Sequence, residues 1–197
     1  MQPLAFSGEE VAAASKMMHG EIVVGAAEER FTSMAGDYRI LHLATHGRAD
    51  NRVGDYAFLA FTEIKDSIEN ELLYVKDLYN LELNADLVVL SACETGIGKL
   101  QRGEGIISLA RAFAYAGAKS IITTLWEVND KSNSELMCYF YRELKWGKSK
   151  DEALRLAQHR YFDKAAPRGL HPFFWAAFVP VGICGLFGRA CILKVND

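Results

Sequence analysis

The feature that most constrains the fold is an apolar run that ends in a small-residue turn carrying a cysteine. It spans residues 87–96, with the sequence LVVLSACETG. Four apolar residues are too few for a helix, and two of them are β-branched, so the run predicts a fully buried strand. Such a strand delivers Cys93 to one edge of a sheet.

A second run of the same build spans residues 40–47, ILHLATHG, and ends in His46 and Gly47. In α/β proteins, sites form at the carboxyl ends of parallel strands, so Cys93 and His46 are expected at the same edge. A neighbouring imidazole raises the thiolate fraction of a cysteine and later protonates the leaving amine. The backbone N–H groups of Gly47 and Cys93 would hold the oxyanion of a tetrahedral intermediate.

Each of these residues also has a plainer explanation. Cys93 on its own fits a core thiol, and His46 with Gly47 fits a turn at a strand end. The two together favour a catalytic dyad. His42 lies mid-strand and is expected to be a hydrogen-bonded core histidine, and Cys138 is expected to pack on a helix face.

The alternation of strands with helices of about a dozen residues predicts one α/β domain with a mostly parallel sheet and helices on both faces. Strands are expected over 21–24, 38–45, 57–61, 71–75, 86–92, 120–126 and 174–181, and helices over 8–18, 26–35, 75–80, 105–115, 132–146 and 149–162. The domain is expected over residues 1–185, with residues 186–197 as a C-terminal tail. Because the chain opens with a helix, we also expect the first strand of the sheet to be truncated or supplied by another chain.

Composition narrows the function classes. The net charge is −3 with both signs mixed, and no basic-aromatic patch occurs, so nucleic acid is not an expected partner. The four cysteines show neither CxxC nor zinc spacing, which predicts no metal, free thiols and a cytoplasmic location. No cofactor is expected, because the glycine pairs lack GxGxxG spacing. The uncharged segment 172–188 is too short and too rich in Pro and Gly for a membrane span.

Five ordered blocks of the sequence resemble the CHAT domain. They are LATHG (43–47), LSACETG (90–96), RGEG with LARAFAYAGA (102–105 and 109–118), LWEVND (125–130) and HPFFWAAFV (171–179). The resemblance implies a caspase-like three-layer α/β/α sandwich, with His46 as base, Cys93 as nucleophile, and Gly47 and Cys93 as oxyanion donors. It also implies a clan CD cysteine peptidase associated with TPR repeats and with bacterial defence and signalling.

The substrate preference is open. In the caspase relatives, the residue two before the nucleophile lines the substrate pocket, and here that residue is the small, neutral Ser91. The other pocket candidates are Glu94, Glu104, Trp126 and Asp130. Glu104 and Asp130 are alternatively explained as residues that cap the helices after them, and Trp126 as a core residue.

Three functions follow from these observations. The first is a cysteine endopeptidase that cleaves a protein substrate and is regulated by a fused or bound sensor such as TPR repeats. The second is a non-catalytic caspase-like interaction module. The third is a small-molecule hydrolase or acyltransferase that uses the same thiol, since a fold does not determine a function.

Overall fold

The computed structural model describes most of the chain. The described residues are 12, 15–18, 21–24, 27–48, 57–61, 72–91, 93–94, 104–126, 129–186 and 192–196, with the backbone alone described at 22, 24, 48, 93, 94, 104–108, 130 and 192–196.

Strands and helices alternate along these residues. The strands are β1 (Glu21–Val24), β2 (Ile40–Ala44), β3 (Gly47–Arg48), β4 (Phe58–Ala60), β5 (Leu72–Tyr74), β6 (Leu87–Leu90), β7 (Cys93–Glu94), β8 (Ser120–Thr124), β9 (Phe178–Gly182) and β10 (Ile192–Asn196). The α-helices are α2 (Glu28–Met34), α3 (Val75–Leu78), α4 (Glu104–Tyr115), α5 (Asp130–Lys145) and α6 (Lys150–Lys164), and the 3₁₀ turns are η1 (Ala35–Asp37), η3 (Pro167–Leu170) and η4 (Pro172–Phe174).

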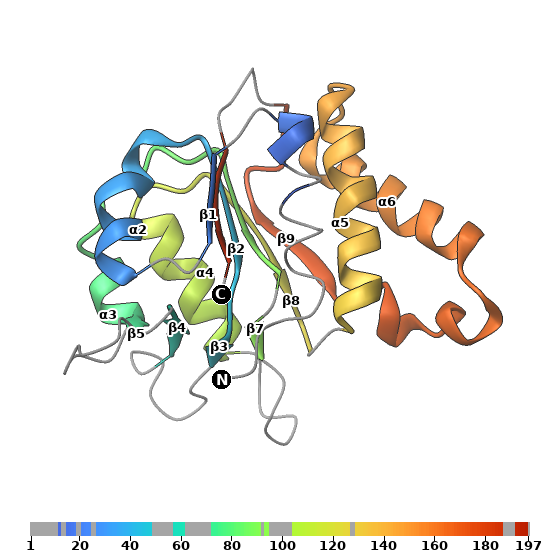
Figure 1. Cartoon of the computed structure of the whole chain (residues 1–197), viewed down its shortest axis with the longest axis horizontal. Helices are drawn as coiled ribbons and strands as arrows, with labels where there is room; N and C mark the ends of the chain where they lie inside the picture. Colours follow the sequence, from blue (N-terminus) through green and yellow to red (C-terminus); the bar gives the residue numbers. More distant parts are fainter. Residues whose placement is uncertain are drawn as a thin grey trace.

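The central sheet has the strand order β1-β10-β2-β6-β8-β9 among the described strands. All neighbours are parallel except β8 and β9, which pair antiparallel. The helices form one layer on each face, with α2, α3 and α4 on one side and α5 and α6 on the other (Figure 1). The expected three-layer α/β/α architecture with a mostly parallel sheet is therefore confirmed.

Two apolar cores fill the spaces between the sheet and its helix layers. In β6, Val88 and Leu90 pack in the core that includes Phe113 of α4, whereas Leu87 and Val89 pack in the core that includes Phe140 of α5. All four residues of β6 have 0% exposure. Successive side chains of a strand point to opposite faces, so a strand that is covered on both sides must be apolar throughout.

A smaller sheet continues from the carboxyl ends of the central strands, with the order β5-β4-β3-β7 (Figure 1). The expected peripheral pair is present as β4 and β5, which pair antiparallel. The helix expected over 8–18 falls largely outside the described residues, of which 12 and 15–18 are helical.

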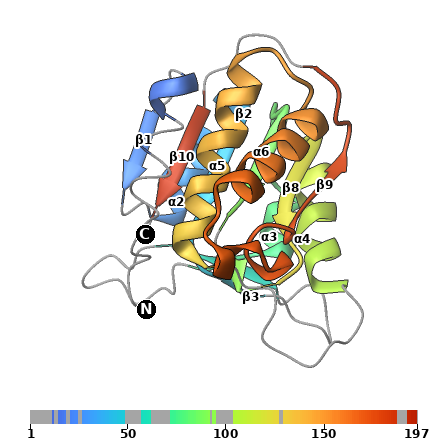
Figure 2. The ribbon, with the colours of Figure 1, turned by 90° about the vertical axis from the view of Figure 1, so that its right-hand side faces the viewer.

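Residues 186–197 differ from the expected tail. Residues 192–196 form β10, which lies inside the central sheet between β1 and β2 (Figure 2). The sheet thus has a strand next to β2 that the sequence pattern did not assign to it. The proposed truncated first strand falls on residues 1–7, which lie outside the described residues.

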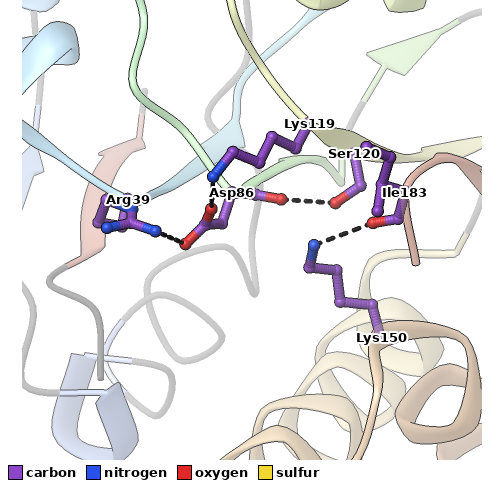
Figure 3. Close-up of polar contacts among 6 residues, drawn as sticks. All are labelled: Arg39, Asp86, Lys119, Ser120, Lys150 and Ile183. Carbon is purple, nitrogen blue, oxygen red and sulfur yellow. Dashed lines mark hydrogen bonds and ion pairs between the residues drawn. The ribbon is translucent and has the colours of Figure 1, made fainter. Parts of the chain in front are cut away.

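Polar contacts join the strands at the amino edge of the sheet (Figure 3). The carboxylate of Asp86 accepts hydrogen bonds from Arg39 and, at 2.9 Å, from Lys119, while its carbonyl accepts one from Ser120. Burial opposes ionisation of this carboxyl, but the bonds from Lys119 and Arg39 outweigh burial and lower the pKa of Asp86 below its ordinary value. Asp86 therefore ties together the chain segments that lead into β2, β6 and β8.

Candidate active site at the carboxyl ends of the strands

His46 lies where the chain passes from the central sheet to the small sheet. Strand β2 ends at Ala44 and β3 begins at Gly47. The backbone carbonyl of His46 accepts a hydrogen bond of 2.7 Å from the N–H of Ala60, and the hydroxyl of Thr45 donates to the carbonyl of Ala60. The backbone around His46 is therefore held on β4. His46 itself is partly exposed.

The backbone of Cys93 lies beside this segment. Strands β3 and β7 pair in parallel, and Gly47 is the register partner of Cys93. Neighbouring strands lie about 4.8 Å apart, so the two expected oxyanion donors are on adjacent strands, and His46 is the residue before one of them. The arrangement places the expected base, nucleophile and N–H donors on two paired segments.

A buried polar network lies behind these strand ends. His42, with 0% exposure, contacts the hydroxyl of Tyr141 through Nδ1 at 2.6 Å and the hydroxyl of Ser91 through Nε2 at 3.1 Å. The side-chain amide of Asn133 donates to the carbonyl of Ser91 at 2.7 Å. His42 is thus a core histidine with both ring nitrogens engaged, as the sequence predicts.

The network connects the two site strands to helix α5. His42 lies four residues before His46 on the β2 segment, and Ser91 lies two residues before Cys93. Sequence reasoning did not single out Asn133 and Tyr141. Their spacing could have indicated them. Residues 133, 137 and 141 share one face of a helix, and the other contacts of that face are apolar.

Ser91 is fully buried, and its hydroxyl faces His42. Its role in a substrate pocket stays a prediction, and the structure gives its side chain a contact of a different kind. Strand β7 places the backbone of Glu94 opposite Arg48. Glu104 and Asp130 are the first residues of α4 and α5.

The cap of α5 differs from the expectation for Asp130. The capping residue is Asn129, whose side-chain oxygen accepts a hydrogen bond of 3.3 Å from the N–H of Ser132. Asp130 follows it as the first helical residue, where a carboxylate is favourable for the helix dipole.

Trp126 follows the end of β8, the neighbour of β6. Its indole Nε1 donates a hydrogen bond of 3.0 Å to the carbonyl of Phe173, and its side chain is partly exposed. Leu125 and Phe173 are 47% and 44% exposed. An aromatic and aliphatic surface therefore adjoins the strand ends on the β8 side.

Other site types lack support in the described part of the chain. No group of three or more His, Cys, Asp or Glu residues there has the arrangement of a metal site. Among the described cysteines, Cys138 and Cys184 are not in a disulfide. None of the described helices combines the length and the apolar character that a membrane crossing requires.

Comparison with known proteins assigns the chain to a family. The family model of the CHAT domain matches residues 1–183, which confirms the resemblance. The chain is 32% identical over 115 residues to tetratricopeptide repeat protein 28 of Mus musculus and 29% identical over 119 residues to the protein of the same name from Homo sapiens. These matches cover 56% and 58% of the chain but 4% of each relative, so the chain spans a small part of their length.

Proposed function

Because this chain belongs to the CHAT-domain family, we propose that it is a cysteine endopeptidase with Cys93 as nucleophile and His46 as base. The parallel pairing of β3 with β7 is the observation that carries the proposal, since it sets Gly47 beside Cys93. The partly exposed His46 precedes Gly47, so base and nucleophile come from paired segments.

The chemistry follows from this pairing. His46 takes the thiol proton, and the thiolate of Cys93 attacks the peptide carbonyl to form a tetrahedral intermediate. The N–H groups of Gly47 and Cys93 stabilise its oxyanion. The intermediate collapses to a thioester when the imidazolium protonates the leaving amine, and water then releases the acid.

The substrate is a protein segment that extends across the strand ends. Trp126 forms a wall on the β8 side, where Leu125 and Phe173 add apolar surface. Glu94, Glu104 and Asp130 supply acidic groups to the same edge in this proposal. Both matched relatives are tetratricopeptide repeat proteins by name, which supports a TPR segment as the regulatory partner.

Alkylation of Cys93 tests the dyad without knowledge of the substrate. A free thiol has a pKa near 8.5 and is only a few per cent thiolate at pH 7. If His46 activates it, His46→Ala lowers the rate of iodoacetamide labelling at Cys93 by about tenfold, as measured by mass spectrometry of the peptides after digestion. Cys138 on α5, which is not in a disulfide, is the internal control.

Cleavage is measured in parallel on a peptide library. Cys93→Ala and His46→Ala are both expected to abolish cleavage while the unfolding midpoint stays the same. Full activity in either variant contradicts the mechanism.

The second candidate is a non-catalytic interaction module. The names of the two relatives favour it, because both name a repeat and neither names an enzymatic activity. Binding to a TPR partner that survives Cys93→Ala, together with slow labelling of Cys93 in the unmodified chain, favours this function.

A further inference from the structure

Strand β10 fills a slot that the rest of the sheet leaves between β1 and β2. It pairs in parallel on both sides, from Glu21↔Leu193 to Val24↔Asn196 on β1 and from Ile192↔Ile40 to Asn196↔Ala44 on β2. Among the described strands, β1 contacts the central sheet only through β10 (Figure 2). Residues 192–196 also lie beyond the family match, which ends at residue 183.

The slot requires an occupant. Every residue of β2 is buried with 0% exposure while β10 is in place, so departure of β10 opens apolar side chains and a row of unpaired N–H and C=O groups to solvent. Such an open edge is a template for pairing with another strand. A strand of the same sequence from another chain restores the same ladder, because it makes the same backbone hydrogen bonds.

The two strands that the link joins, β9 and β10, lie far apart in the sheet. Nine residues separate Gly182, on the opposite edge strand, from Ile192. Four strand spacings lie between β9 and β10, which is about 19 Å. Nine residues reach about 30 Å, so the chain's own segment can fill the slot.

The first part of this link is held at the amino edge of the sheet. The N–H of Ile183 donates to the carbonyl of Lys119 at 2.8 Å, and the N–H of Lys150 donates to the carbonyl of Cys184 at 3.0 Å. The buried Lys150 ammonium donates to the carbonyl of Ile183 at 3.0 Å (Figure 3). The hydrogen bonds of the described part of the link end at Cys184, and the number of residues that follow decides whether β10 reaches its own slot.

We propose that the slot between β1 and β2 is a strand-binding site that accepts residues 192–196 from a second copy of the chain as well as from its own. Two copies then associate by exchanging β10. The contacts are identical in both arrangements, so the balance depends on protein concentration against the effective concentration of the tethered strand, which is on the order of millimolar. This inference is independent of catalysis by Cys93.

Deletion of residues 186–190 tests the inference by making the link too short. Five Cα steps then join Gly182 to Ile192 and reach about 17 Å, which is less than the span of about 19 Å. We expect this variant to form a folded dimer at micromolar concentration. The dimer affinity rises by about a thousandfold because the strand can no longer pair within its own chain. The matched control replaces the same five residues by Gly-Ser-Gly-Ser-Gly and stays monomeric in light scattering.

A disulfide identifies which chain supplies the strand. Glu21 is exposed and pairs with Leu193, and neighbouring strands are close enough for a disulfide. The single variants Glu21→Cys and Leu193→Cys are unfolded, mixed and refolded together, and mass spectrometry then detects the 21–193 link. The double variant in one chain is the positive control for geometry.

The two experiments together decide the question. A 21–193 link between the two single variants, rising with protein concentration, supports strand exchange even if the deletion variant does not fold. Absence of that link up to about millimolar concentration overturns the proposal. A deletion variant that stays monomeric and folded with an unchanged unfolding midpoint also overturns it, because the slot then needs no β10.

Discussion

The buried contact between Tyr141 and His42 makes a sharp prediction about stability. The two atoms are 2.6 Å apart, and both residues have 0% exposure. Tyr141→Phe removes the hydroxyl and keeps the ring that packs in the core around α5. Loss of one partner of a buried hydrogen bond costs about 1–3 kcal/mol, and full burial with a short contact places the expected loss at about 2 kcal/mol.

Urea unfolding followed by tryptophan fluorescence measures this loss. With a slope of about 2 kcal/mol per molar, the midpoint falls by about 1 M while the slope is unchanged. Tyr139→Phe is the matched control on the same helix, because Tyr139 is partly exposed and its ring lies under Arg142 and Lys164. We expect the control to change stability by less than about 0.5 kcal/mol. A loss in Tyr141→Phe no larger than in the control refutes the argument that the network is a stabilising unit.

Three further predictions concern the fold and the site. Asp86→Asn removes a carboxylate whose pKa is lowered in the folded protein. That carboxylate contributes about 2 kcal/mol of stability above about pH 4, and the contribution disappears as the pH falls through the folded pKa. Plots of the unfolding free energy against pH should therefore converge for the two proteins, and a constant difference down to about pH 2 contradicts the argument. Gly117→Ala places a Cβ against the carbonyl of Leu83 at φ +113°, whereas Gly147→Ala at φ +81° meets open space. Calorimetry should show a loss of about 3 kcal/mol or more for Gly117→Ala and about 1 kcal/mol for Gly147→Ala, and equal losses would disprove the steric reason. Trp126→Phe removes the hydrogen bond to η4 and should reduce peptide cleavage more than stability, which a comparison of kcat/KM with the unfolding midpoint measures.

Much of the fold follows from local pattern. The mainly apolar runs that become β2 and β6 are buried on both faces, as strands covered on both sides must be. The amphipathic spacing of residues 136, 137, 140, 141 and 144 sets the buried face of α5. The sequence also indicated His46, Gly47 and Cys93 as a group, because small residues follow each of the two strands. Local pattern suffices here because hydrophobic periodicity records which face of an element is covered.

Only the tertiary structure decided how distant segments pair. Strand β10 joins β1 and β2 through backbone hydrogen bonds, which carry no residue signature, so Ile192–Asn196 reads as a tail in the sequence. The contact of Ser91 also required the structure. The family resemblance implied a substrate pocket for this residue, but its hydroxyl faces His42 on another strand. The sequence by itself indicated most of the elements and the residues expected at their ends, whereas the sheet order and the buried polar contacts required the three-dimensional arrangement, because both depend on residues far apart in the chain.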